Sequence, residues 1–141
     1  MRVSGVVSLA LLLGACSSDP SGPDGGALVG LFGNPDQRAQ LVALHGSAEL
    51  QLPCGEYFEV PDPIRLAADL TFRADGTWHP RAFGIPMDPV HGAAVGSYET
   101  ATGRVRLHLE LGGDDPLSYV LESGVSAGLD HVVCALSAPA D

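Results

Sequence analysis

The sequence contains no lysine. All seven basic residues are arginines, against 17 acidic residues, and the formal net charge is −10. Nucleic-acid binding needs a basic stripe that follows the phosphate backbone, and binding to anionic lipid surfaces also needs basic residues. We therefore expect no nucleic-acid partner and no anionic lipid bound by the folded part; the acidic charge favours solubility.

The motifs of common cofactor and metal sites are also absent. There is no glycine-rich phosphate loop before a helix, and no Cys-x-x-Cys or Cys-x-x-His pair for zinc. His79, Asp88 and His91 flank one stretch and are an alternative set of metal ligands, although an exposed polar loop explains them more simply. We expect a non-enzymatic protein with no catalytic residues, no metal and no cofactor.

One short apolar run, residues 6–13 (VVSLALLL), lies near the N-terminus, and no later segment has a comparable run. Arg2 precedes it and the small residues Gly14 and Ala15 follow it, which is the three-part pattern of a secretory signal. The run is far shorter than the roughly 20 residues that cross a bilayer. We therefore interpret it as a signal peptide rather than a lasting membrane span.

The residues Leu13-Gly14-Ala15-Cys16 resemble the lipobox of bacterial lipoproteins. The resemblance implies that residues 1–15 are removed and that Cys16 carries fatty-acyl chains such as palmitate, which anchor the protein in a membrane of the cell envelope. Ser17 after the cysteine favours the outer membrane in a diderm host. The alternative is a plain secretory signal with an incidental Cys16.

Residues 16–26 form the segment behind the anchor. They are rich in Ser, Pro, Gly and Asp, which predicts a flexible tether. Residues 27–141 then form one domain, which we expect to be monomeric. Removal of the signal takes Arg2 away and leaves 6 basic against 17 acidic residues, a net charge of −11.

The chain has three cysteines. Lipid attachment at Cys16 leaves Cys54 and Cys134 as an even pair in an oxidising compartment, which predicts a disulfide. A bond between them closes a loop of about 80 residues and contributes roughly 4 to 5 kcal/mol in the chain-entropy model. Two buried free thiols are the alternative.

Short segments of alternating apolar and polar residues, separated by Gly, Pro and Asp, predict an all-β domain. The clearest strand covers 104–111, with leucines and a valine on one face and charged residues on the other. A second alternating series covers 66–73. Ala74-Asp75-Gly76 is expected to turn it into a strand that begins at Thr77.

Further strands are expected over 27–32, 49–52, 56–60, 95–99, 117–122 and 129–136, with a hairpin turn at 100–103. Residues 37–45 fit either a short helix or a strand, and we favour a strand. Residues 81–93 are expected to be a loop or a broken edge strand. These seven to nine strands predict an antiparallel up-and-down meander closed into a small barrel, with a sandwich as the alternative. A disulfide between Cys54 and the last strand favours closure.

Three motifs resemble small secreted lipocalin-like domains. They are Leu44-His45-Gly46 with Leu52-Pro53, the hairpin-like Leu70–Trp78 (LTFRADGTW), and Gly96-Ser97-Tyr98 followed by Val105-Arg106-Leu107. The resemblance implies a barrel that binds a ligand without catalysis.

Two functions follow from that resemblance. In the first, a small apolar ligand lies in the barrel mouth against Phe72, Trp78, Tyr98 and Leu107. In the alternative, the protein is an interaction or inhibitor lipoprotein that presents a loop such as 84–92 to a partner. An acidic surface suits a basic partner such as a lysozyme; a protease is another example.

Overall fold

The computed structural model describes residues 26–113 and 115–129. Eight strands within them close into an antiparallel barrel, and two short strands form a separate hairpin. The barrel strands are β1 (Gly30–Asn34), β2 (Ala39–Ala43), β3 (Ala48–Gln51), β4 (Tyr57–Val60), β5 (Thr71–His79), β8 (Val90–Glu99), β9 (Arg104–Glu110) and β10 (Leu117–Ser123). A 3-10 turn, η1 (Pro53–Gly55), joins β3 to β4, and the hairpin consists of β6 (Arg81–Ala82) and β7 (Ile85–Pro86). The predicted all-β fold and closed meander are confirmed.

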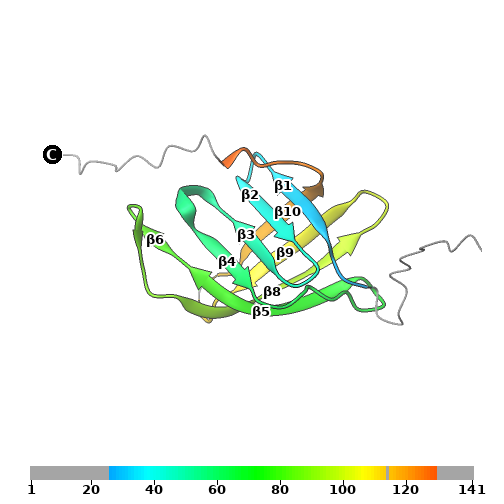
Figure 1. Cartoon of the computed structure of the whole chain (residues 1–141), viewed down its shortest axis with the longest axis horizontal. Coiled ribbons are helices and arrows are strands. Elements are labelled where there is room, and N and C mark those ends of the chain that lie inside the picture. Colours follow the sequence, from blue (N-terminus) through cyan, green and yellow to red (C-terminus); the bar gives the residue numbers. More distant parts are fainter. Residues whose placement is uncertain (1–25, 114, 130–141) are drawn as a thin grey trace, which may run out of the picture.

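Chain order determines the barrel order, β1-β10-β9-β8-β5-β4-β3-β2, and all neighbours are antiparallel. Among the described residues, the connection from β5 to β8 is the one that contains strands of its own, the β6–β7 hairpin. Figure 1 shows β1–β4 crossing in front of β8, β9 and β10, with β5 along the lower edge of the barrel. The hairpin lies at one end of the long axis, and the start of the described chain at residue 26 lies at the other end.

The alternating pattern of β9 is confirmed in detail. Val105, Leu107 and Leu109 are buried, whereas Arg106 and Glu110 are exposed. All eight barrel strands contribute inward side chains to one continuous apolar cluster, which includes Phe32, Leu41, Leu50, Phe58, Trp78, Ala94, Leu109 and Leu121. Burial of this apolar surface is the main stabilising contribution to the barrel.

The hairpin predicted at residues 74–76 is wrong. β5 runs unbroken from Thr71 to His79 and pairs with β8 from Thr71 to Trp78. Residues 67–70, which were expected to belong to a strand, form the turn before β5, in which the Leu70 N–H donates to the Ala67 carbonyl at 2.9 Å.

Gly76 explains why an Asp-Gly pair occurs inside a strand. A Cβ atom at this position would lie 2.6 Å from the Phe58 ring and would also collide with the backbone oxygen of Glu59. The absent side chain therefore lets β5 pass closely over β4, which is one of the uses of glycine within a strand.

The other predicted strands within the described residues are confirmed, and their ends differ by at most five residues. Residues 37–45 contain the strand β2, the turn at 100–103 joins β8 to β9, and residues 81–93 contain the small hairpin and the start of β8. The strand expected over 129–136 lies outside the described residues from residue 130 onward. β10 pairs with β1, so the barrel closes within residues 30–123.

Candidate functional site

Three of the four residues predicted to contact a ligand belong to the packed core. Phe72, Trp78 and Leu107 are 5%, 8% and 4% exposed. Because so little of their surface is accessible, these three pack mainly against other protein atoms. Phe72 and Leu107 also line the floor of a hollow of about 780 Å³ that is described below. Tyr98 is half-buried, and its ring meets Phe32 edge-on with ring centres 6.1 Å apart. A ligand role for these four residues stays a prediction.

A small apolar hollow lies at the barrel end where residues 26–29 lead into β1. Its volume is about 270 Å³, and Leu28, Phe32, Leu70 and Tyr98 are among its lining residues. This volume is slightly below the roughly 300 to 1,000 Å³ of typical small-molecule sites. The hollow is the place where a small apolar ligand would contact Tyr98.

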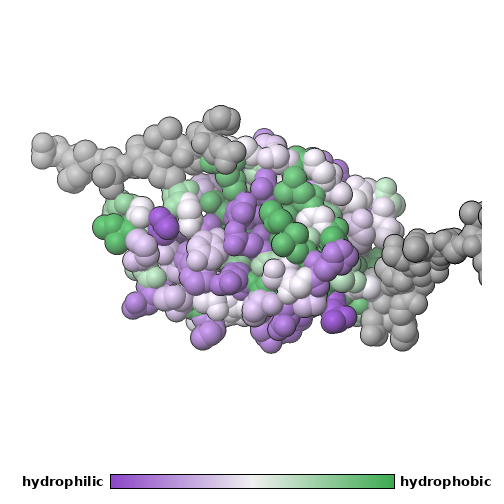
Figure 2. Space-filling model, viewed as in Figure 1, coloured by the Kyte–Doolittle hydropathy of each residue, from purple (hydrophilic) through white to green (hydrophobic). Residues whose placement is uncertain are grey.

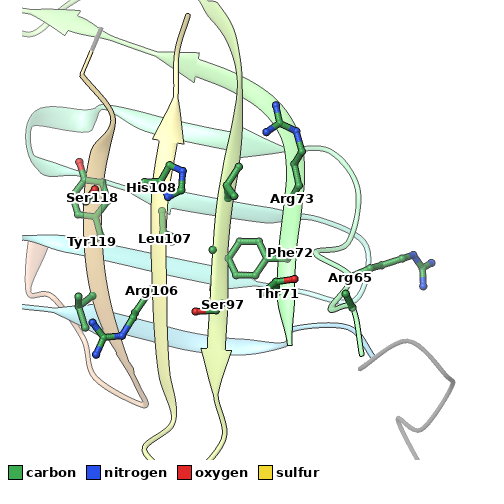
Figure 3. Close-up of a pocket in the computed structure, with 14 residues that line it drawn as sticks. Arg65, Thr71, Phe72, Arg73, Ser97, Arg106, Leu107, His108, Ser118 and Tyr119 are labelled. Atoms are coloured by element: carbon green, nitrogen blue, oxygen red, sulfur yellow. The ribbon is translucent and has the colours of Figure 1, made fainter. Parts of the chain in front are cut away.

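A hollow of about 780 Å³ lies on the outer face of the sheet formed by β5, β8, β9 and β10, and we call it the arginine trough. Figure 3 shows its lining residues. The strand register places its outward side chains in two rows across the four strands. These rows are Thr71–Ser97–Arg106–Val120 and Arg73–Val95–His108–Ser118. Arg65 and Ala67, which precede β5, complete the rim.

The charges in the trough are only partly neutralised. Arg73 donates to Glu110 at 2.7 Å, and this hydrogen bond raises the pKa of Arg73 and lowers the pKa of Glu110. His108 Nε2 lies 3.5 Å from the same carboxylate. Arg106 makes no side-chain hydrogen bond or ion pair with the residues that the structure describes.

The second conspicuous feature is the apolar hairpin, which we define as residues 81–87. Phe83, Ile85 and Met87 are 74%, 67% and 54% exposed. Phe83 and Gly84 form the two-residue turn with φ of 52° and 77°. Positive φ at both positions is required in a type I′ turn, where Asn or Gly normally takes the first position. A bulky residue there is a backbone outlier that costs on the order of 1 to 3 kcal/mol.

The base of the apolar hairpin is fixed to the barrel by hydrogen bonds. The Arg81 N–H donates to Glu56 Oε1 at 3.2 Å, and the Met87 N–H donates to the Pro80 carbonyl at 3.0 Å. The Arg81 guanidinium also donates to the Gly84 carbonyl at 3.4 Å. These contacts hold the exposed apolar tip in one orientation.

The predicted alternative metal ligands are not brought together. Among residues 26–113 and 115–129, no group of three or more His, Cys, Asp or Glu side chains is placed to hold a metal ion. His79 instead stacks on Tyr57 with ring centres 4.3 Å apart, and its Nε2 lies 3.4 Å from Glu59 without forming a hydrogen bond.

The predicted lipid site and disulfide are only partly within the described residues. Cys54 lies in η1, between β3 and β4, with positive φ. Cys16 and Cys134 lie outside the described residues, so acylation and the Cys54–Cys134 bond stay predictions. In the part of the chain that the structure covers, no helix has the length and apolar character needed to span a membrane.

Comparison with known proteins finds no protein-family model, curated protein or solved structure that matches the chain. Function is therefore inferred from the geometry of the molecule. The sequence pointed to loop 84–92 as an interaction surface, but it did not single out Phe83. It also gave no indication of the trough, because the trough depends on strand register.

Proposed function

We propose that the protein is a lipid-anchored, non-enzymatic interaction protein that binds a protein partner through the apolar hairpin. The observation that carries the proposal is Phe83, which is both strongly exposed and held at positive φ. The positive φ disfavours folding, and the exposed ring gains no burial energy from the barrel. Strained residues of this kind cluster at binding sites, where partner contacts compensate for them.

The position of the apolar hairpin favours a protein partner over the anchoring membrane. The hairpin and residue 26, which follows the tether, lie at opposite ends of the long axis (Figure 1). A tether from Cys16 therefore leaves the tip facing away from the anchored end. The acidic chain also opposes insertion into anionic lipid, and Arg81 is the only basic residue of the hairpin.

Charge and exposed surface together indicate the kind of partner. Figure 2 shows hydrophobic residues at the hairpin end, on a face that is otherwise largely hydrophilic apart from a second hydrophobic area over β1 and β2. Few large aromatic and aliphatic anchors carry most of the energy of a protein interface. The net charge of −10 favours fast association with a positively charged surface. The expected partner has an apolar pocket for Phe83 within a basic surface. A basic enzyme such as a lysozyme fits this charge requirement.

The packed barrel interior supports this proposal over the carrier function. A carrier of small apolar molecules needs an internal chamber, whereas Phe72, Trp78 and Leu107 are buried in the core cluster. The hollow of about 270 Å³ beside Tyr98 is the observation that favours a second candidate function, the binding of a small apolar ligand.

Site-specific photo-cross-linking in the native host tests the main proposal. A photoreactive phenylalanine at position 83 should form an adduct with a protein partner, and the same residue at position 102, in the β8–β9 turn, should not. The recovered partner, once purified, should bind the Phe83→Asp variant at least tenfold more weakly than the wild type, because an interface anchor is typically worth 2 kcal/mol or more. The matched Thr102→Asp variant, with the same added charge, should bind normally.

Two results would contradict the proposal. One is equal affinity of the purified partner for the wild type and the Phe83→Asp variant. The other is a small apolar molecule retained in native mass spectrometry of protein from its host, together with no adduct at position 83; this result supports the carrier function.

The membrane anchor has a separate test. Cys16→Ser should move the protein from the membrane fraction to the soluble fraction, because only an acylated cysteine supplies the buried methylene groups. The circular dichroism spectrum and thermal midpoint of the domain should not change. A variant that still sediments with membranes would show that acylation at Cys16 is not the anchor.

A further inference from the structure

We infer that the arginine trough is a binding site for an extended anionic ligand, with Arg106 as its main contact and Arg73 as its second. This site is independent of the apolar hairpin. It differs from the function proposed above both in its position and in the chemistry of what it binds.

The trough is a basic island on an acidic protein. Its fourteen lining residues include Arg65, Arg73, Arg106 and His108, and none of the fourteen is acidic. The outward rows on either side do carry acidic residues, with Asp75 and Glu110 in one and Glu99 and Glu122 in the other. The two central rows therefore carry only basic charged residues, whereas the rows on either side are acidic or paired.

Arg106 is the arginine on the strands of this hollow that has no acidic partner among the described residues. The neighbouring Arg104 pairs with Glu122 at 3.0 Å, and Arg73 pairs with Glu110 at 2.7 Å. Arg106 has the short side chains of Ser97 and Val120 beside it in its row, and no described acidic side chain lies within ion-pair distance. Its guanidinium keeps all five N–H donors for carboxylate or phosphate oxygens.

The spacing of the arginines determines the length of the ligand. Arg73 is on β5 and Arg106 is on β9, with β8 between them, so two strand spacings of about 4.8 Å separate them by about 10 Å across the sheet. Their rows are also two residues apart along the strands, which adds about 7 Å in that direction and gives a separation of about 12 Å between the two backbone positions. One small anion cannot contact both. A ligand with anionic groups at each end can, and the hydroxyls of Ser97 and Ser118 on the same face offer further hydrogen bonds.

The close-up view supports this division of roles. Figure 3 shows Arg106 and His108 on β9, Arg73 on β5 and Ser97 on the strand between them. Arg65 lies beyond β5 and points away from the strands, so it belongs to the rim rather than to the proposed contacts. Glu110 competes with a ligand for Arg73.

Titration calorimetry of the whole purified protein, at constant ionic strength, tests the inference with inorganic phosphate and tripolyphosphate as probes. Tripolyphosphate should bind at least tenfold more tightly than phosphate, because linked anionic groups gain effective concentration. Arg106→Gln should weaken tripolyphosphate binding at least tenfold. The matched control Arg38→Gln removes the same charge in the exposed β1–β2 turn and should leave the affinity unchanged.

A variant that should bind tripolyphosphate more tightly provides a second test. Glu110→Gln should raise the affinity for tripolyphosphate about threefold or more, since it releases Arg73 and removes a negative charge at the edge of the trough. All of these side chains are exposed, and unchanged thermal midpoints would verify that the variants fold. The Phe83→Asp variant should bind tripolyphosphate normally, which separates this site from the apolar hairpin.

Three results would overturn the inference. They are no detectable binding of tripolyphosphate, equal losses in the Arg106 and Arg38 variants, and equal affinities for phosphate and tripolyphosphate. A Glu110→Gln variant with wild-type affinity would contradict the part assigned to Arg73.

Discussion

The barrel interior buries phenylalanine, whereas the apolar hairpin exposes it to solvent. Phe58, on β4, is fully buried, whereas Phe83, at the hairpin tip, is 74% exposed. The barrel avoids a steric clash between β5 and β4 by placing Gly76 over the Phe58 ring. The hairpin accepts strain by placing phenylalanine where asparagine or glycine is favoured.

This difference separates residues that serve the fold from residues that serve an interaction. Along the barrel strands, the burial of apolar side chains agrees with the alternating sequence pattern, as expected of a sequence that specifies one structure. Positive φ also occurs at Arg38, Cys54 and Leu70, but at Phe83 it coincides with a strongly exposed aromatic ring. Hydrogen bonds from Arg81 and Met87 keep the hairpin in place. If this interpretation is correct, substitutions in the two regions should have effects of opposite sign on stability.

Truncation of a core aromatic should have the largest effect on stability. Phe58→Ala should lower the free energy of unfolding by about 3 to 5 kcal/mol, because it removes buried surface and leaves a cavity among β3, β4 and β5. Urea denaturation monitored by circular dichroism measures the loss. Phe83→Ala is the matched control and should change stability by less than about 0.5 kcal/mol. Similar losses in both variants would remove the distinction between the two regions.

The predicted disulfide should have the next largest effect. Cys54→Ser should lower the free energy of unfolding by roughly 4 kcal/mol if Cys54 and Cys134 are bonded. Cys54 lies in η1, and a Cβ atom added to the neighbouring Gly55 would lie 3.3 Å from the Arg81 guanidinium at the hairpin base. The bond would therefore support the chain next to the hairpin base as well as the barrel. Reduction of the wild type should reproduce the loss. Alkylation of both cysteines in the folded, unreduced protein would disprove the bond.

Much of the barrel could be predicted from the sequence because its signals are local. The alternation along β9 and the glycine-containing turn after β8 each depend on neighbouring residues, and both are confirmed. The prediction failed at Ala74-Asp75-Gly76, where the usual turn interpretation of Asp-Gly was overridden by the contact of Gly76 with Phe58. That contact joins two strands and leaves no local signal.

The candidate sites were harder to predict for the same reason. Arg73, Ser97 and Arg106 come from three strands, and only the register places them on one face. The apolar hairpin was partly foreseen, since loop 84–92 was expected to be exposed. The strain at Phe83 arises because the two-residue turn needs positive φ at both positions. The sequence Phe83-Gly84 does not favour that conformation at its first position.

Relief of strain at the tip should give a smaller effect, and of the opposite sign. Phe83→Asn should raise the free energy of unfolding by about 1 kcal/mol, because asparagine tolerates positive φ. It should also weaken partner binding, since the aromatic anchor is lost. Phe83→Ala weakens binding without relieving the strain, so it serves as the control. A Phe83→Asn protein less stable than the wild type would mean that the phenylalanine stabilises the hairpin.

The smallest effect on stability is expected on the outer face of the barrel, where charges are exposed and paired. The hydrogen bond from Arg73 holds the pKa of Glu110 below its ordinary value of 4.5. Because the folded pKa is depressed, this pair contributes stability above the ordinary value, and the contribution is lost as the pH falls through the folded pKa.

Arg73→Gln should therefore return the pKa of Glu110 toward 4.5, as measured by NMR titration of its carboxyl group. The free energy of unfolding at pH 7 should change by less than about 1 kcal/mol, since exposed ion pairs are screened by solvent. Arg38→Gln is the matched control and should leave the Glu110 titration unchanged. A large loss of stability at pH 7 would show that the Arg73–Glu110 pair stabilises the fold as the barrel core does. It would contradict the interpretation of this pair as surface residues that are available for binding.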